Sequence, residues 1–206
     1  MFYRIPTEEY LMGYIYCIIG KSGTGKDTVL ENLLHSDDID ITKIVPHTTR
    51  PKRENEHDGV QYHFVSNEEL LRMENDGQVI EKRTYNTVYG EWTYFTSTQE
   101  LNDYTDYGII TTQKALQKFF DKFGQERIYV FYLKLDDKER LERCIARESV
   151  QDVPNYKEVC RRFLADEEDF DESELASYKN CSIIDTMCTP KECAESIVKI
   201  IKRHKK

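Results

Sequence analysis

An α/β fold, with helices on both faces of a parallel sheet, is the architecture that the sequence predicts, and three observations predict it. Residues 14–19 form a short run that is apolar on both faces, as expected of a buried parallel strand. A glycine-rich turn at residues 20–25 follows, and then a helical pattern of apolar residues from Lys26 to Leu34. Strand and helix patterns alternate along the rest of the chain, which is typical of a parallel sheet covered on both faces.

The remaining elements follow in order. Strands are expected at residues 41–45, 60–65, 78–81, 89–96, 107–111, 128–135 and 181–184, and helices from residue 67, at 98–102 behind a Ser97 cap, at 114–123, 136–147 and 155–170, and from Pro190 onward. We therefore expect a single domain over residues 1–206. Its parts are a lead-in at 1–13, a core of 14–45, 104–139 and 180–206, a small antiparallel subdomain at 46–97 and a helical lid at 140–170.

Length, charge and cysteines limit the classes of function. The chain has 206 residues, of which 39% are apolar, and a net charge of −9. Such an acidic chain is not expected to bind nucleic acid, since that requires a basic stripe. Six cysteines without C-x-x-C spacing disfavour a zinc site and fit reduced thiols in the cytoplasm. The longest early apolar stretch is too short to span a bilayer, so no membrane partner is expected.

Residues 20–28, Gly-Lys-Ser-Gly-Thr-Gly-Lys-Asp-Thr, fit the pattern G-x-x-x-x-G-K of a P-loop, so the expected fold is of the P-loop NTPase type. Glycines let consecutive backbone N–H groups turn toward phosphate oxygens, and the helix N-terminus adds partial positive charge. Lys26 is expected to reach the terminal phosphates of ATP as a mobile, solvent-facing cation. The candidate ATP-binding residues are Gly20, Ser22, Gly23, Thr24, Gly25, Lys26, Asp27 and Thr28. Asp27 and Thr28 are also the candidate Mg²⁺ ligands, with Asp27 standing where a Ser or Thr is usual.

A second dense pattern comprises Thr48-Thr49-Arg50, Arg53, Gly59, Tyr62 and Phe64-Val65. Behind a P-loop, this segment resembles that of the guanylate kinase family, which runs T-T-R-x-x-R-x-x-E and then Gly, Tyr and Phe-Val. The resemblance covers residues 14–204 and implies that Arg50, Arg53 and Tyr62 hold the phosphate of an acceptor nucleotide. Paired guanidinium groups suit a phosphate better than point charges do. A solvated loop is the other interpretation of such a charged run.

The segments Val79-Ile80-Glu81 and Tyr94-Phe95-Thr96-Ser97 are similar to two further segments of that family. The similarity implies that Glu81 reads the N–H donors of guanine, that Tyr94 binds the phosphate and that Thr96 contacts the base. Tyr89-Gly90 is a competing match for the second segment. A glutamate on the surface of a strand is the alternative interpretation of Glu81.

Arginines late in the chain complete the resemblance. Arg143 and Arg147 lie one helical turn apart and share a face of the expected helix, and Arg162 belongs to the next helix. In the family, a lid brings arginines onto the transferring phosphoryl group, whose spread charge guanidinium donors stabilise. The resemblance thus assigns catalytic roles to Lys26, Arg147 and Arg162, with Arg143 as a substitute for Arg147. Plain surface ion pairs are the other interpretation.

The chain departs from the family at three places. Pro46 stands where the family has a serine, Asp27 follows the P-loop lysine, and Thr111 and Gln113 are the nearest equivalents of two aspartates. The acceptor-phosphate residues are therefore retained, while the base-reading and metal residues are altered. We expect Glu81 to be the main base reader left, a modest preference for GMP over AMP, and a sharper one in a Gln113→Asp variant.

These residues predict ATP-dependent phosphorylation of a nucleoside monophosphate, most of all GMP, by a P-loop kinase that uses Mg²⁺. Ribose 1,5-bisphosphate phosphokinase, a relative with the same fold, also tends to have Asp after the lysine but lacks the full T-T-R-x-x-R segment. A non-catalytic binding module of this fold is a third hypothesis, although such modules typically lose the P-loop lysine and glycines present here. Oligomeric state does not follow from the sequence.

Overall fold

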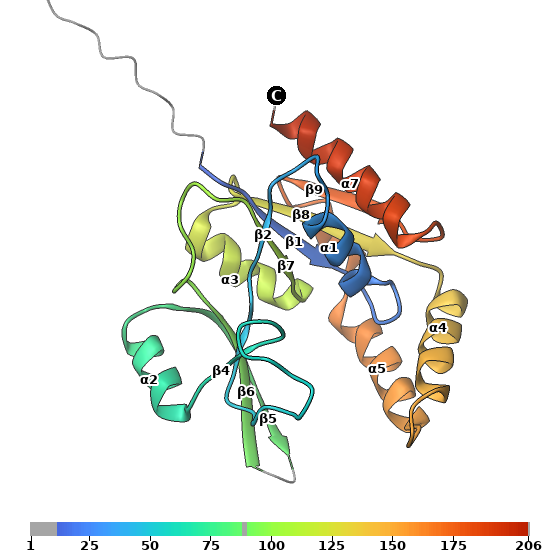
Figure 1. Cartoon of the computed structure of the whole chain (residues 1–206). Coiled ribbons are helices and arrows are strands. Elements are labelled where there is room, and N and C mark those ends of the chain that lie inside the picture. Colours follow the sequence, from blue (N-terminus) through green and yellow to red (C-terminus); the bar gives the residue numbers. More distant parts are fainter. Residues whose placement is uncertain (1–11, 88–89, 206) are drawn as a thin grey trace, which may run out of the picture.

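A computed structural model describes residues 12–87 and 90–205, so the lead-in expected at 1–13 lies almost wholly outside the described residues. Its centre is a five-stranded sheet in the order β2-β7-β1-β8-β9 (Figure 1). The strands are β2 (Thr42–Lys43), β7 (Tyr107–Ile110), β1 (Ile15–Ile19), β8 (Ile128–Lys134) and β9 (Cys181–Asp185). All neighbouring strands pair in parallel, which confirms the predicted α/β class.

β1 is the central strand because its side chains are apolar on both faces, and none of its five residues is more than 1% exposed. Tyr16 and Ile18 face one hydrophobic cluster, which packs against α1 (Lys26–Leu34) and α7 (Pro190–His204). Ile15, Cys17 and Ile19 face the other cluster, which packs against α3 (Gln113–Phe123). The P-loop leaves the end of this strand, so its starting point is fixed by the core.

A second, four-stranded sheet in the order β4-β3-β6-β5 lies below the first in Figure 1. Its strands are β3 (His47–Thr48), β4 (His63–Phe64), β5 (Val79–Thr87) and β6 (Gly90–Ser97), and α2 (Asn67–Asn75) packs on it. β6 pairs antiparallel with both β3 and β5, but β3 and β4 are parallel, so the small sheet is mixed rather than antiparallel throughout. The two-residue strand β3 is too short for a periodic signal, and the sequence did not predict it.

The helix expected at residues 98–102 is absent, and a turn occupies the segment. The Thr98 N–H donates to the Gln78 carbonyl, which ties the segment to the start of β5. The Ser97 hydroxyl accepts from the Gln99 N–H, so it closes a local turn instead of capping a helix. This turn directs the chain from β6 toward β7.

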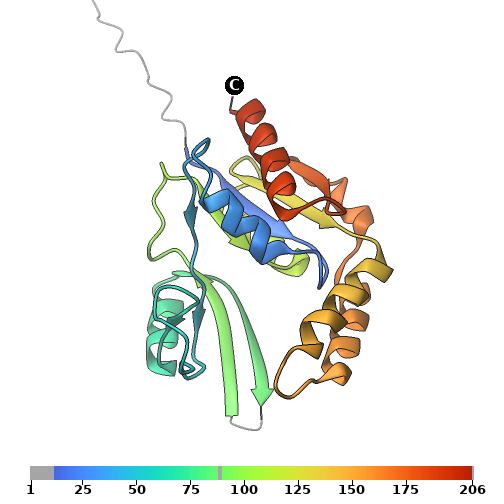
Figure 2. The same ribbon diagram turned by 45° about the vertical axis from the view of Figure 1, so that its right-hand side comes forward.

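The helices α4 (Asp137–Ser149) and α5 (Tyr156–Asp169) form an antiparallel pair, and the short α6 (Glu172–Leu175) leads back to the core. Figure 2 shows that this pair extends from the large sheet and lies opposite the β5–β6 hairpin. The P-loop lies between them at the edge of the large sheet (Figure 2). In the described part of the chain, no helix combines the length and the apolar character that crossing a bilayer requires.

Candidate active site

The P-loop joins β1 to α1 through three glycines with positive φ, which are Gly20, Gly23 and Gly25. Gly25, with φ 84°, stands at the N-cap of α1 and offers no side chain to cap it, so the first N–H groups of the helix stay available to an anion. A Cβ built on Gly25 would meet no described heavy atom within 4 Å, whereas one on Gly23 would lie 2.6 Å from the Arg140 carbonyl oxygen. Gly25 therefore faces open space, and Gly23 permits close packing against α4.

The hydroxyl of Thr24 donates to the Lys21 carbonyl at 2.9 Å and braces the loop from inside. Lys26 folds back over the same loop, where its Nζ donates to the carbonyls of Gly20 at 2.7 Å and Lys21 at 3.1 Å. Burial lowers the pKa of Lys26, while nearby Asp27 and Asp166 act in the opposite direction. The expectation that Lys26 faces solvent is therefore wrong for this state, because the ammonium group replaces phosphate contacts with loop carbonyls.

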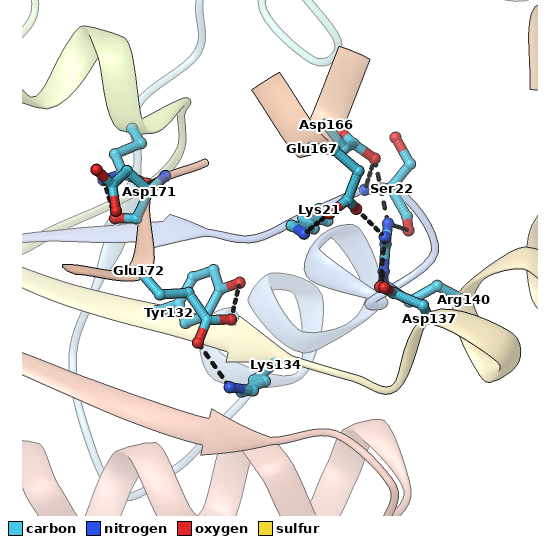
Figure 3. Close-up of polar contacts among 11 residues, drawn as sticks. Lys21, Ser22, Tyr132, Lys134, Asp137, Arg140, Asp166, Glu167, Asp171 and Glu172 are labelled. Atoms are coloured by element: carbon cyan, nitrogen blue, oxygen red, sulfur yellow. Dashed lines mark hydrogen bonds and ion pairs between the residues drawn. The ribbon is translucent and has the colours of Figure 1, made fainter. Parts of the chain in front are cut away.

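Carboxylates from the C-terminal half of α5 lie against the P-loop (Figure 3). Asp166 Oδ2 accepts from the Ser22 backbone N–H at 2.6 Å, and Glu167 Oε2 pairs with Lys21 Nζ at 2.7 Å. A carboxylate on a backbone N–H of this loop occupies the kind of position that a phosphate oxygen takes in a P-loop. The loop thus already holds an anion, supplied by the chain itself.

Arg140 of α4 joins these groups and is fully buried. Its Nη1 donates to the Ser22 carbonyl at 3.2 Å and to Asp166 at 3.3 Å, and its Nη2 reaches Asp137 and Glu167 (Figure 3). Arg140 was not predicted as a site residue, because a buried arginine in a charged helix has the same local pattern as an exposed one. A buried guanidinium requires several acceptors, and here they come from the P-loop and both helices of the pair.

Of the two candidate Mg²⁺ ligands, Asp27 lines the main cleft, and Thr28 is exposed but does not. No three His, Cys, Asp or Glu side chains among residues 12–87 and 90–205 gather in a way that could hold a metal ion. Mg²⁺ usually keeps several waters and takes one or two carboxylates together with substrate phosphates. The single carboxylate of Asp27, beside the P-loop, fits that kind of site.

The main cleft has a volume of about 820 Å³ and extends from α1 to the small sheet and α5. Tyr62, Tyr94 and Thr96, three of the predicted acceptor residues, line it, and so does Arg162 from α5. Aromatic side chains of the β5–β6 hairpin, Tyr85 and Trp92, complete the wall. The structure therefore brings the P-loop end of α1, three of the predicted acceptor residues and part of the helix pair around one space.

Arg50 is buried beside this cleft rather than on its wall. Its two terminal nitrogens bind the Glu56 carboxylate at 2.7 and 3.0 Å, and its guanidinium lies 5.7 Å from the ring centre of Tyr62. The bond from Arg50 lowers the pKa of Glu56 to about 2, so this pair stays ionised at any ordinary pH. Arg53 gives its backbone N–H to the same carboxylate, and its side chain is exposed and outside the cleft lining.

Glu81 is buried at the base of the hairpin, directly across from Thr96 on β6. The Thr96 hydroxyl donates to Glu81 Oε1 at 3.0 Å, and Arg83 Nε lies 3.3 Å from Glu81 Oε2. The alternative interpretation of Glu81 as a glutamate on the surface of a strand is therefore wrong. Arg83 was not predicted as a site residue, because it lies two residues after Glu81 in a strand whose charged residues form no special pattern.

The predicted catalytic arginines are not gathered at one point. Arg162 Nε pairs with Glu158 at 2.7 Å at the cleft wall, and Arg143 donates to the Thr186 carbonyl at 3.3 Å near the end of β9. Arg147 is exposed on α4, although its charge lowers the pKa of Lys26 as one of several contributions. Of the three, Arg162 therefore has the most direct access to the cleft.

The residues that depart from the family differ in their positions. Pro46 lines the main cleft. Gln113 is buried and turned away from it, because its amide nitrogen donates to the Asp171 carbonyl at 2.8 Å and to Glu174 at 3.1 Å. Its carbonyl oxygen accepts from the Asp171 N–H at 3.2 Å. Gln113 is thus a tether between α3 and the segment around α6.

The sequence profile of the guanylate kinase family matches residues 12–171. Guanylate kinase of Neisseria gonorrhoeae is 42% identical over 95 residues, which is 46% of this chain and 44% of that protein. Guanylate kinase of Anaplasma phagocytophilum is 32% identical over 126 residues, or 59% of this chain and 58% of that protein. The matched segments thus span about half the length of these curated relatives.

Solved structures support the fold over most of the chain. A crystal structure of the Anaplasma phagocytophilum guanylate kinase has a TM-score of 0.61 at 22% identity and covers 94% of this chain and 86% of its own. A gluconokinase from Sinorhizobium meliloti, with a TM-score of 0.50 at 11% identity, covers 93% of this chain and 92% of its own. The structural likeness shows the fold, and the match to the family profile shows the family membership. The chain belongs to the guanylate kinase family.

Proposed function

We propose that this protein transfers a phosphoryl group from ATP to a nucleoside monophosphate, with GMP as the acceptor, yielding ADP and GDP. The observation that carries the proposal is the single cleft lined by Asp27 from the P-loop end of α1, by Tyr62 and Tyr94 from the small sheet, and by Arg162. Donor and acceptor phosphates bound at its two ends would face each other. Family membership supports the same reaction.

The P-loop residues 20–28 would hold the ATP phosphates through backbone N–H groups and Lys26. That step requires Lys26 to exchange the carbonyls of Gly20 and Lys21 for phosphate oxygens, and Asp166 to leave the Ser22 N–H. Tyr62, Tyr94 and the arginines Arg50 and Arg53 would bind the acceptor phosphate. An acceptor phosphate oxygen is already anionic, so the attack needs no protein base, and positioning with electrostatic stabilisation supplies the catalysis.

Charge develops on the transferring group, and guanidinium donors would balance it. Arg162 lines the cleft and would serve first, with Arg147 and Arg143 reaching the group after movement of the helix pair. Magnesium, when bound, neutralises phosphate charge, and Asp27 would hold it directly or through water. Thr28 is the weaker ligand candidate, since its side chain does not line the cleft.

Other parts of the proposal follow from the fold. Residues 46–97 would act as the monophosphate-binding subdomain and 140–170 as a lid that excludes water. Neither ribose 1,5-bisphosphate as the acceptor nor a non-catalytic binding role is favoured by the comparisons. A cytoplasmic location rests on cysteine usage and stays a prediction.

A coupled ADP-release assay tests the proposal. The purified chain would be supplied with MgATP and, one at a time, GMP, dGMP, AMP, CMP, UMP and ribose 1,5-bisphosphate. We expect turnover with GMP above that with the other bases. Turnover with ribose 1,5-bisphosphate alone would replace the proposal by the related kinase, and binding of GMP without any ADP release would replace it by the binding module.

A further inference from the structure

Arg83 lies where two clefts meet. It lines the main cleft and also a second one of about 600 Å³ between β5 and α3, together with Tyr85, which lines both. Thr96 opens on the main cleft, and Glu81 opens on the second. A nucleotide with its phosphate at Tyr62 and Tyr94 would therefore place its base beside Arg83 when it extends toward Glu81.

The Glu81 carboxylate retains capacity for a ligand. Oε1 accepts from Thr96 at 3.0 Å, and Oε2 faces Arg83 Nε at 3.3 Å. Each carboxylate oxygen can accept about two hydrogen bonds, so the two contacts fix its orientation and leave lone pairs for further donors. The side chain is only 6% exposed, so that orientation is held by the fold.

Arg83 brings donors to the same place. Its guanidinium carries N–H groups in a planar fork, and the contact with Glu81 uses the Nε side of that fork. The side chain is 41% exposed, in keeping with its position at the junction of two solvent-accessible clefts. A carboxylate and a guanidinium thus stand side by side, one accepting and one donating.

We propose that Arg83 is a specificity-determining residue of the acceptor site, donating a hydrogen bond to the 6-oxo group of a guanine whose N1–H and 2-amino group bind Glu81. The inference rests on the proposed function. Guanine presents an acceptor, O6, next to two donors along one edge, and this order matches Arg83 followed by Glu81. Adenine presents an amino group and then the acceptor N1, so its donor would face Arg83 and its acceptor would face Glu81.

With Arg83 as a donor, the base can be recognised without a contribution from the altered residues Pro46 and Gln113. Gln113 uses its amide on Asp171 and Glu174, and Pro46 has no side-chain donor. A site whose polar groups lose their partner rejects an analogue strongly, because buried groups are left unpaired. At the base of the hairpin Glu81 is such a buried group, and Arg83 adds a donor beside it.

The test compares Arg83→Ala with Lys82→Ala, a matched control. Lys82 is the adjacent cation, but it lines only the second cleft and not the main one, and it pairs with Glu74 on α2. The probes are GMP, its 6-thio analogue, which has a weak acceptor at position 6, IMP, which lacks only the 2-amino group, and AMP. The measurement is kcat/KM for each acceptor at fixed MgATP.

For Arg83→Ala we expect kcat/KM with GMP to fall by roughly 10- to 100-fold, the worth of one hydrogen bond from a charged donor. The ratio of GMP to 6-thio-GMP should collapse toward one and the preference over AMP should narrow, while the ratio of GMP to IMP stays as in the parent. Lys82→Ala should keep all ratios. Arg83→Lys, which keeps the charge and changes the fork, should recover part of the preference for GMP over 6-thio-GMP.

Three results would overturn the inference. Equal losses with all four acceptors would assign Arg83 to the phosphate, and unchanged values would remove it from the site. A joint collapse of the 6-thio and IMP ratios would mean that Arg83 acts only by orienting Glu81. Each of these leaves GMP kinase activity standing, whereas a parent protein that phosphorylates no nucleoside monophosphate would contradict the proposed function itself.

Discussion

Asp166 Oδ2 accepts a hydrogen bond from the Ser22 backbone N–H at 2.6 Å, so a carboxylate of α5 occupies an N–H group of the P-loop. The same oxygen lies 3.3 Å from Arg140 Nη1, which keeps the carboxylate in place. In the proposed reaction, phosphate oxygens would compete with Asp166 for the loop. ATP would then have to displace Asp166 from this position, and the contact would reduce the affinity for ATP.

Replacing Asp166 by Asn should tighten MgATP binding by roughly 2- to 10-fold, the net worth of one hydrogen bond. Arg140 would retain Asp137 and Glu167, so the fold should persist. Isothermal titration calorimetry measures the effect, and Asp169→Asn, on the same helix but paired with Lys114, is the control for net charge. Weaker MgATP binding in Asp166→Asn would instead make Asp166 a ligand of the nucleotide site.

Lys26→Ala should reduce kcat by roughly 10²- to 10³-fold, as removal of one preorganised donor to developing charge does elsewhere. The fold should persist, because the hydrogen bonds that Lys26 donates go to the carbonyls of Gly20 and Lys21 within the P-loop and do not join it to another element. Steady-state kinetics and a thermal melt measure the two effects. Lys202→Ala, a change at the ion pair with Asp38 on the far side of the core, is the control. Parent-like turnover in Lys26→Ala would remove this lysine from the mechanism.

Arg53→Ala should raise the KM for GMP by roughly 10- to 100-fold, since a charge-assisted contact is worth about 1.5–3 kcal/mol. The KM for ATP should barely change, because Arg53 is remote from the P-loop in sequence and belongs to the small subdomain. Arg72→Ala on α2, which loses only its pairs with Glu69 and Asp76, is the control. Equal increases in both KM values would show that Arg50 and Arg53 do not form a separate acceptor site.

Gln113→Asp should leave the preference for GMP over AMP unchanged, contrary to the expectation from sequence. The residue is buried against Asp171 and Glu174, so a carboxylate there would lose two donated hydrogen bonds and face Glu174 at close range. We expect a destabilisation of about 2 kcal/mol or more, measured by urea unfolding at pH 7. Gln117→Asp, exposed on the same helix, should cost much less. A stronger preference for GMP over AMP in Gln113→Asp would instead show that residue 113 takes part in recognising the base.

His47 should make stability depend on pH. Burial, followed by the nearby charge of His63, lowers its pKa to about 4, against which Glu100, Asp58 and Glu69 act weakly. Between about pH 4 and pH 6.5, His47 is protonated in the unfolded chain but stays neutral in the folded chain. The resulting contribution of His47 to the free energy of unfolding is therefore complete above about pH 6.5 and is lost as pH falls toward 4. The loss is of the order of 3 kcal/mol.

His47→Phe keeps a ring against Phe95 and cannot titrate, so its free energy of unfolding should fall less between pH 7 and pH 4.5 than that of the parent. His35→Phe, at an exposed position after α1, is the control. Urea unfolding at several pH values measures the difference. Equal losses of stability in parent and His47→Phe would contradict the assignment.

The parts of the fold and site that could be predicted are those with a local signal. The spacing of Gly20, Gly25 and Lys26 after a buried strand identified the P-loop, and apolar runs identified the central strands. The turn at Thr98 was missed because its hydrogen bond to Gln78 crosses 20 residues of sequence. Arg140 was missed for the same reason, since Ser22, Asp166 and Glu167 belong to other elements. Arg83 was missed because its pair with Glu81 lies within one charged strand and leaves no special pattern.

The packing of Gly23 has a mechanical consequence. A Cβ there would lie 2.6 Å from the Arg140 carbonyl oxygen and 3.0 Å from Cys144 Sγ, so α4 packs closely against the P-loop, in addition to the hydrogen bond from Arg140 to the Ser22 carbonyl. By contrast, α5 is attached to the loop by an ion pair and a hydrogen bond, which water and phosphate can replace. The hinge of the molecule should therefore fall at residues 150–155, between α4 and α5. In that arrangement α4 would move less than α5 when the proposed lid of residues 140–170 closes.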